Sequence, residues 1–200
     1  MLRFDTKYGT ETAGYIGWED LRKIEIVNQD KGHGYQGASK GALERSLKSL
    51  AINYEEYVFL DFGSGKGWGL LLASHFPFKK IIGIELFEML HRVAEKNVTG
   101  YKGSKRKCYN IDCFCMNVLE FELPKYPLVC FLFNPFQKDM IRQLLEKIST
   151  SVLESPRPVM IIYQNPRFIS IFDECQLLIR RKMVKIPFIG QLNYAIYSSK

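Results

Sequence analysis

Seven runs with the length of a β-strand recur along the chain. Most of them are apolar and rich in β-branched and aromatic residues, and polar or glycine-containing segments separate them, as is typical of strands that are buried in a sheet. The runs lie at residues 57–62, 80–86, 109–116, 127–133, 158–164, 177–186 and 192–198. We therefore expect a sheet of seven strands.

Apolar residues at helical spacing fill most of the intervals between these strands. The expected helices span residues 39–50, 68–77, 86–97, 138–148 and 168–175. Strands that alternate with helices predict an α/β fold with a mostly parallel sheet, because each helix returns the chain to the start of the next strand. The last two strands are separated by a segment that contains Pro187 and Gly190.

A glycine-rich turn follows the first strand. Asp61 lies near the end of this strand, and glycines occupy positions 63, 65, 67 and 69. Glycine adopts positive φ and lets a ligand approach the backbone closely, at an entropic cost that a turn without a ligand has little reason to carry. Strand, turn, helix and strand form a βαβ unit whose turn lies at the carboxyl edge of the sheet. We expect a ligand on this turn.

Two classes of ligand fit a turn of this kind. The dinucleotide pattern is G-x-G-x-x-G, whereas here Gly65 is followed by a glycine at position 67 and not at 68. Glu85 lies 20 positions after Gly65, which suits a ribose diol in either class. Asp61 separates the classes, because a carboxylate repels a pyrophosphate but accepts hydrogen bonds from an ammonium group.

Residues 61–67, with the sequence Asp-Phe-Gly-Ser-Gly-Lys-Gly, and the acid at position 85 resemble the first two motifs of the class I S-adenosylmethionine-dependent methyltransferases. The resemblance extends over most of the chain from about residue 50. It implies a Rossmann-like, doubly wound, mostly parallel seven-stranded sheet with an antiparallel terminal strand, and S-adenosyl-L-methionine as cofactor. The cofactor-binding residues that it implies are Asp61, Gly63, Ser64, Gly65 and Gly67 around the methionine portion, and Glu85 at the ribose hydroxyls.

A third cofactor contact is expected where the strand at 109–116 ends. In the family that the chain resembles, an acidic residue in this turn meets the adenine. This chain has Met116-Asn117-Val118 instead, so the match is partial. Asn117 can still both donate to and accept from an adenine edge.

The tripeptide Asn134-Pro135-Phe136 follows the apolar run at 127–133, at the carboxyl end of an expected central strand. An Asn oxygen accepts hydrogen bonds from an amino group, proline stiffens the turn, and an aromatic ring stacks on a flat acceptor. The tripeptide is similar to a shortened N/D-P-P-Y/F motif of amino-directed methyltransferases, which implies a nitrogen acceptor. The missing second proline leaves the acceptor class open, and a simple strand-ending turn is the alternative.

Residues 1–38 show no clear periodicity. Their glycines and aromatic residues predict an ordered but irregular arm, or lid, that folds over the site. Tyr35 and His33, flanked by glycines, are candidates to close over the acceptor or to act as a general base; a surface loop is the alternative. We therefore expect an amino-terminal arm at 1–38 and a methyltransferase domain at 39–200, which together form one domain.

The composition limits the size, the cellular compartment and the partners that we expect for the protein. At 200 residues with 46% hydrophobic residues, the chain suits one domain, and the absence of a signal sequence or a long apolar run predicts a cytoplasmic protein without membrane contact. Five cysteines without a C-x-x-C pair predict free thiols and no metal site. The net charge of +7, with basic clusters at 102–107 and 180–185, is compatible with nucleic acid, although solvated surfaces explain each cluster more simply.

The leading hypothesis is an enzyme that transfers the methyl group of S-adenosylmethionine in line to a nitrogen atom. A protein lysine or another amine is slightly favoured over a nucleic-acid base as the acceptor. Two alternatives remain, a nucleotide-dependent oxidoreductase of Rossmann type and a noncatalytic nucleic-acid-binding protein with a cofactor-like pocket. Neither the acceptor nor the oligomeric state follows from the sequence.

Overall fold

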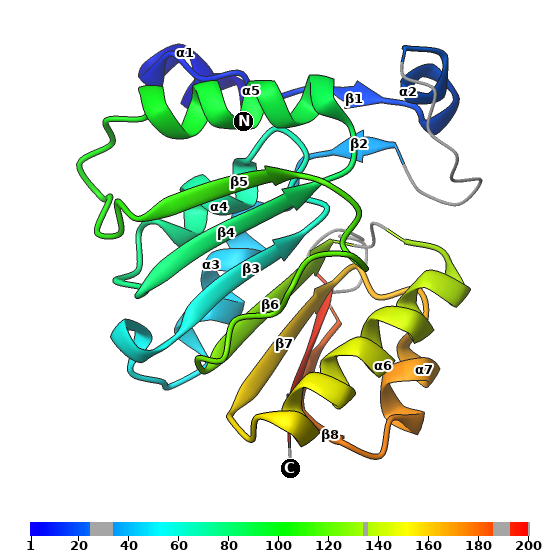
Figure 1. Cartoon of the computed structure of the whole chain (residues 1–200). Coiled ribbons are helices and arrows are strands. Elements are labelled where there is room, and N and C mark those ends of the chain that lie inside the picture. Colours follow the sequence, from blue (N-terminus) through cyan, green and yellow to red (C-terminus); the bar gives the residue numbers. More distant parts are fainter. Residues whose placement is uncertain (25–33, 134–135, 186–192, 200) are drawn as a thin grey trace.

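A seven-stranded sheet forms the centre of the computed structural model, which describes residues 1–24, 34–133, 136–185 and 193–199 (Figure 1). The strand order is β5-β4-β3-β6-β7-β9-β8. The strands are β3 (Val58–Phe62), β4 (Lys80–Glu85), β5 (Ile111–Cys115), β6 (Leu128–Phe133), β7 (Val159–Gln164), β8 (Leu178–Val184) and β9 (Tyr194–Ser199). Neighbouring strands from β5 to β7 are parallel, and β9 lies antiparallel between β7 and β8. The predicted mostly parallel sheet with an antiparallel terminal strand is confirmed.

The strand order reverses beside β3. The chain passes from β3 to β4 on one side, and it later returns to add β6 on the other side. In doubly wound sheets, ligands bind at the carboxyl ends of the strands at such a switch point. The glycine turn follows β3 directly, so the fold places it where a ligand is expected.

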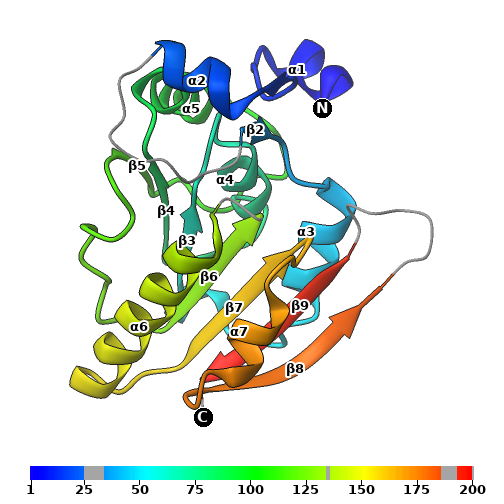
Figure 2. The same ribbon diagram turned by 90° about the vertical axis from the view of Figure 1, so that its right-hand side faces the viewer.

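Helices cover both faces of the sheet (Figure 2). On one face, α6 (Lys138–Glu154) and α7 (Ile169–Glu174) bury apolar side chains such as Leu144 and Phe172. On the other face, α3 (Lys40–Lys48) and α4 (Trp68–Ala73) contribute Leu47 and Leu71, and α5 (Glu88–Gly100) packs beside β5. A single-turn 3-10 helix, η1 (Tyr54–Glu56), precedes β3.

The arm is more regular than the sequence predicted. It contains α1 (Leu2–Tyr8), β1 (Tyr15–Ile16), α2 (Trp18–Ile24) and β2 (Tyr35–Gln36), and β1 pairs antiparallel with β2. The prediction of an irregular arm was wrong in this respect because α1 buries no residue and each strand has only two residues, so neither leaves a periodic apolar pattern. The domain boundary expected at residue 38 stays a prediction.

Within the described ranges, no helix has the length and the hydropathy that crossing a membrane requires. The five cysteines are free thiols, and Cys115 is exposed.

Candidate functional site

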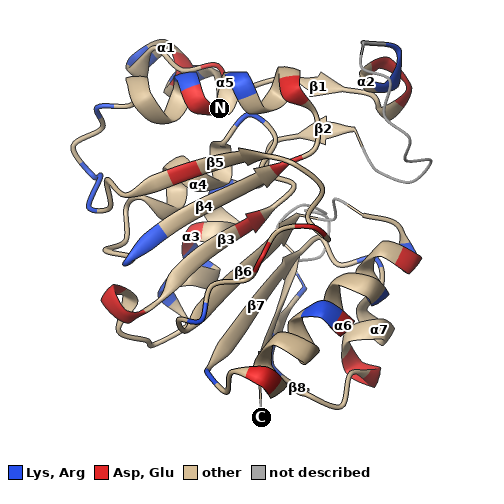
Figure 3. Cartoon of the chain, viewed as in Figure 1, with Lys and Arg blue, Asp and Glu red and all other residues tan. Residues whose placement is uncertain are grey.

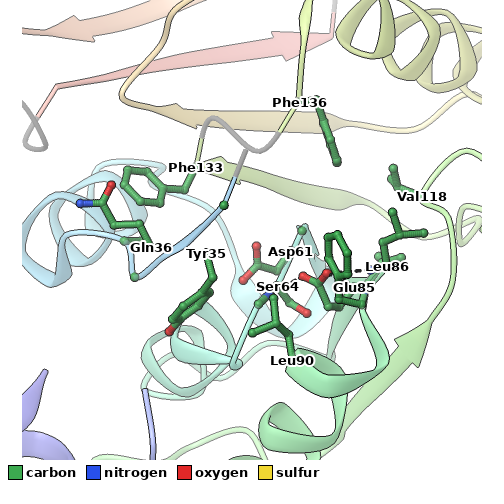
Figure 4. Close-up of a pocket in the computed structure, with 18 of the residues that line it drawn as sticks. Tyr35, Gln36, Asp61, Ser64, Glu85, Leu86, Leu90, Val118, Phe133 and Phe136 are labelled. Atoms are coloured by element: carbon green, nitrogen blue, oxygen red, sulfur yellow. Dashed lines mark hydrogen bonds between the residues drawn. The ribbon is translucent and has the colours of Figure 1, made fainter. Parts of the chain in front are cut away.

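A cavity of about 390 Å³ opens at the carboxyl ends of β3, β4 and β6. Its size lies in the range of small-molecule sites. The glycine turn, residues that follow β4, β5 and β6, and side chains of the arm from β1, α2 and β2 line it. Figure 4 shows Tyr35 and Gln36 of β2 together with the residues of the sheet edge. The cavity thus coincides with the place where the sequence predicted a ligand.

The backbone of the glycine turn requires glycine at three positions. Gly63, Gly65 and Gly67 have φ values of 82°, 53° and 79°, a region that other residues adopt only under strain. The N–H groups of Gly63 and Ser64 donate to the Ile84 carbonyl at 2.9 and 3.0 Å, which fastens the turn to β4. The turn therefore presents a fixed, bare stretch of backbone to the cavity.

Asp61 places a carboxylate beside this turn. The side chain is buried and lines the cavity, and none of the described residues forms a hydrogen bond with it. Burial and then the charge of Glu85 raise the pKa of Asp61 to about 8. A Cβ atom at Gly69 would approach Asp61 Oδ2 to 2.2 Å, so the glycine at 69 makes room for this carboxylate. A buried acid without a donor can accept hydrogen bonds from a cationic ligand, which favours its ionised form.

Glu85, the last residue of β4, accepts hydrogen bonds from three backbone N–H groups. Its Oε2 accepts a hydrogen bond from the Gly65 N–H at 2.8 Å. Its Oε1 accepts from the N–H groups of Leu86 and Phe87 at 2.8 and 3.0 Å. These bonds orient the carboxylate at the wall of the cavity, where Figure 4 shows it beside Asp61. Both acids lie toward the carboxyl ends of adjacent strands, β3 and β4, and Figure 3 shows acidic positions on both of these strands.

Asn117 lies in the turn after β5 and also lines the cavity. Its Oδ1 accepts a hydrogen bond from the Leu119 N–H at 3.0 Å, which fixes the side-chain amide. No described residue accepts a hydrogen bond from its Nδ2, so this group can donate to a ligand. The structure thus brings the predicted adenine contact into the same cavity as the glycine turn.

The predicted acceptor tripeptide is described only at its last residue. Phe136 is buried, lines the cavity and packs in the core with Val118. Asn134 and Pro135, like His33, lie outside the described residues. Their roles stay predictions.

Tyr35 lies against the glycine turn, and its hydroxyl points away from Asp61 and Glu85 (Figure 4). A Cβ atom at Gly65 would approach the Tyr35 ring to 2.4 Å. The hydroxyl donates to the Thr12 carbonyl at 2.5 Å, and burial together with acidic neighbours raises its pKa. These contacts favour a packing role, while the general-base role stays an untested prediction.

Lys66, within the glycine turn, fastens the arm to the domain. Its Nζ pairs with Glu11 at 2.8 Å and lies 5.6 Å from the centre of the Tyr35 ring. Asn97 of α5 accepts from the Glu11 N–H at 2.8 Å and donates to the Glu11 carbonyl at 3.1 Å and to the Lys66 carbonyl at 2.8 Å. The arm and the glycine turn therefore form one hydrogen-bonded unit.

Several cavity residues were not predicted as site residues. Tyr15 and Gln36 of the arm, Phe133 at the end of β6, and Arg167 after β7 all line the cavity. Arg167 could have been found, because it follows the Asn165-Pro166 turn at the carboxyl end of a parallel strand, as Phe136 does. No sequence pattern predicts that Tyr15 pairs with Gln36, because this pairing depends on how the arm folds.

The two basic clusters contribute no side chain to this cavity wall in the described parts of the chain. Arg106 instead donates to the backbone carbonyls of Val98, Tyr101 and Cys108. Arg180 pairs with Asp173 at 2.9 Å on the edge strand β8.

The fold is similar to those of solved methyltransferases. An RNA methyltransferase from Salinibacter ruber, in complex with S-adenosyl-L-homocysteine, has a TM-score of 0.51 and 16% identity, with 82% of this chain and 92% of that chain covered. The ribosomal protein L11 methylase of Lactobacillus delbrueckii subsp. bulgaricus has a TM-score of 0.54 and 13% identity, with 79% and 77% covered. A dimethyladenosine transferase from Plasmodium falciparum has a TM-score of 0.55 and 14% identity, with 82% and 62% covered.

No protein-family model and no curated protein sequence matches the chain. At these identities the similarity concerns the fold. The chain has the Rossmann-like fold of the class I S-adenosylmethionine-dependent methyltransferases, as its glycine turn predicted.

Proposed function

We propose that the chain is a methyltransferase that uses S-adenosyl-L-methionine and transfers its methyl group to a nitrogen atom. One observation carries the proposal: the buried Asp61 carboxylate, without a donor among the described residues, lies beside a bare glycine turn in a cavity of suitable size. The ammonium group of the cofactor's methionine portion is the kind of cation that this carboxylate lacks.

The remaining lining residues fit the rest of the cofactor. We assign Glu85 to the ribose hydroxyls and Asn117, whose side-chain amide carries an N–H donor, to the adenine, because both residues line the cavity. When bound, the cofactor supplies a methyl group on a positively charged sulfur, so no acid or metal is needed to activate it. The protein's own contribution is to orient the two reactants and to exclude water, and alignment of this kind lowers barriers by about 7–11 kcal/mol.

The sheet order and the charge of the site argue against an oxidoreductase of Rossmann type. Five strands, in the order β5-β4-β3-β6-β7, match the 3-2-1-4-5 part of the dinucleotide-binding sheet. The two sheets differ beyond this part, because here β9 lies antiparallel between β7 and β8. A pyrophosphate on the glycine turn would also face Asp61. A noncatalytic nucleic-acid-binding protein with a cofactor-like pocket would instead bind DNA or RNA in a salt-dependent way without incorporating methyl groups.

The acceptor nitrogen is proposed from the Asn134-Pro135-Phe136 sequence. The names of the similar structures include a ribosomal protein, RNA and adenosine, so both a protein and a nucleic acid occur among them. More of these names refer to RNA or adenosine than to protein, which supports a base more than the slightly favoured lysine.

Calorimetric titration tests the cofactor. We expect S-adenosylmethionine and S-adenosylhomocysteine to bind and NAD not to bind; binding of NAD alone would overturn the proposal. Methyl transfer is then measured with radiolabelled cofactor on cell lysate, with and without nuclease or protease treatment. Asn134→Ala should abolish transfer and spare cofactor affinity, while Asn110→Ala, an exposed position outside the cavity wall, serves as the matched control. Full transfer by Asn134→Ala would remove the acceptor role of Asn134.

A further inference from the structure

The two-residue strands of the arm present different side chains on their two faces. Tyr15 lies opposite Gln36, and Ile16 lies opposite Tyr35. Successive side chains of a strand point to opposite faces, so Tyr15 and Gln36 share one face and Ile16 and Tyr35 share the other. Tyr35 packs on the glycine turn, whereas Tyr15 is 73% exposed and still lines the cavity. Tyr15 and Gln36 therefore lie at the mouth of the cavity.

A third flat group lies at the same mouth. Phe133, at the end of β6, is half-buried, and its ring lies on the same side of the cavity as Gln36 (Figure 4). Aromatic rings stack on bases without strong sequence preference, and a side-chain amide can both donate to and accept from the edge of a base. Two rings and one amide are thus available to a flat acceptor at this opening.

Arg167 adds a positive charge to the opening. It is exposed, and it follows a turn in which Asn165 has a φ of 50°. The backbone N–H groups of Arg167 and Phe168 donate to the Tyr163 hydroxyl at 3.2 and 3.4 Å, which holds the turn. Arg167 is the one basic side chain among the described lining residues of the cavity. A guanidinium group can bind a phosphate with two parallel hydrogen bonds.

We propose that Tyr15, Gln36, Phe133 and Arg167 receive an unpaired base of single-stranded nucleic acid as the methyl acceptor. This inference rests on the proposed function and specifies its substrate class. The rings and the amide hold the base, Arg167 binds a neighbouring phosphate, and the net charge of +7 favours the approach of a polyanion.

The same opening suits a protein lysine less well. The two carboxylates of the cavity wall, Asp61 and Glu85, lie at the glycine turn, where the cofactor is expected. The described residues at the mouth carry no acid that would attract an ammonium group, and Arg167 repels one.

The reaction balances without a further reagent. The amino nitrogen of the base forms a bond to the methyl carbon while the bond from that carbon to sulfur breaks, and the electron pair of the broken bond stays on sulfur. The nitrogen then releases its extra proton to water.

Binding of labelled oligonucleotides tests the proposed acceptor site, which we call the rim and which consists of Tyr15, Gln36, Phe133 and Arg167. The probes are single-stranded RNA and DNA of about 12 nucleotides, the same RNA in a duplex, and a lysine-rich peptide, each measured with and without S-adenosylhomocysteine. Tyr15→Ala should weaken binding of the single strand about 10-fold, because stacking on one ring contributes about 1–3 kcal/mol. Tyr15→Phe, which keeps the ring, should bind within about 2-fold of the wild type. Arg167→Gln should reduce the slope of log affinity against log salt by about 0.7.

Two matched variants control for nonspecific effects. Tyr109→Ala removes a tyrosine with 74% exposure that lies away from the cavity wall. Arg92→Gln removes an arginine of the exposed pair with Glu88. Neither should change binding.

Each result of these binding experiments either supports or refutes the proposed acceptor site. The inference is supported if Tyr15→Ala and Arg167→Gln lose binding of the single-stranded oligonucleotide while both controls keep it. The oligonucleotide that binds better and accepts the methyl group then shows whether the substrate is RNA or DNA. Binding of the peptide alone, preference for the duplex, or strand binding that both rim variants leave unchanged would overturn the inference. Binding of the oligonucleotide in the absence of S-adenosylhomocysteine tests the four proposed acceptor residues independently of the cofactor. Failure of S-adenosylhomocysteine to bind would instead overturn the proposed function.

Discussion

Replacing Asp61 by Asn tests the electrostatic basis of the site. Burial and the charge of Glu85 raise the pKa of Asp61 to about 8. If the ligand's ammonium group requires the ionised carboxylate, only the ionised fraction of the protein binds. With that pKa, about one molecule in a hundred is ionised at pH 6 and about one in ten at pH 7. The affinity of the wild type for S-adenosylhomocysteine should therefore rise about 30-fold between pH 5.5 and 7.0.

The same group makes stability depend on pH in the opposite direction. A carboxyl group whose pKa is raised by folding holds its proton more tightly in the folded state. Its contribution to stability is therefore complete below the unfolded value near 4, and it is lost as the pH rises toward 8, by at most about 1.4 kcal/mol per pH unit. The advantage of Asp61→Asn over the wild type should grow by up to about 3 kcal/mol from pH 5 to pH 7, or about 5–10 °C in Tm.

Two measurements and one control examine this reasoning. Calorimetry at several pH values should give a steep rise in affinity for the wild type and weak, pH-independent binding for Asp61→Asn. Thermal unfolding of the ligand-free proteins should show the variant gaining stability relative to the wild type as the pH rises. Asp112→Asn, on β5 and outside the cavity wall, should change neither trend. The reasoning is refuted if wild type and Asp61→Asn show the same pH dependence in both measurements.

Three further substitutions separate the roles of neighbouring residues. Gly65→Ala should lower Tm by several degrees and abolish binding of S-adenosylhomocysteine, because φ is 53° and the new Cβ atom would meet the Tyr35 ring at 2.4 Å; Gly100→Ala, with nothing within 4 Å, is the control. Glu85→Gln should cost about 1–3 kcal/mol in unfolding free energy, because the amide NH2 cannot accept from the backbone donors around it, and should weaken binding at least tenfold in the same titration. Tyr35→Phe should lower the free energy of unfolding by about 1 kcal/mol, because it loses the hydrogen bond to the Thr12 carbonyl, and it should keep most of the activity in the methyl-transfer assay. If Tyr35 were a general base, the activity would fall about 100-fold or more, and this result would contradict the packing role.

The sequence predicted the central strands closely because they are buried on both faces. The apolar run at 158–164 corresponds to β7 at Val159–Gln164, and the run at 57–62 corresponds to β3 at Val58–Phe62. Helix ends were less certain. The helix expected at 138–148 extends to Glu154, and the one expected at 68–77 ends at Ala73, since local patterns do not specify where packing stops.

Most of the proposed cofactor-binding residues line one cavity for a similar reason. These residues follow parallel strands in sequence, so their position in the chain implies their position in space. The arm offers no such rule. Tyr15 and Gln36 are 21 positions apart and meet only through one two-residue strand pair, and Lys66 reads as part of a ligand turn although its ammonium group binds Glu11.

The strand pair of the arm joins the two halves of the cavity. Because side chains alternate along β1 and β2, the face that carries Tyr35 closes on Gly65, and the face that carries Tyr15 meets the opening. A shift of the pair by one residue would exchange these faces and expose the glycine turn. The Lys66–Glu11 pair and the Asn97 bonds oppose such a shift, because they hold Glu11, which lies four residues before β1. The same contacts thus hold Lys66 of the glycine turn and the segment that leads to Tyr15 of the proposed acceptor site, so the two proposed binding steps depend on one small element.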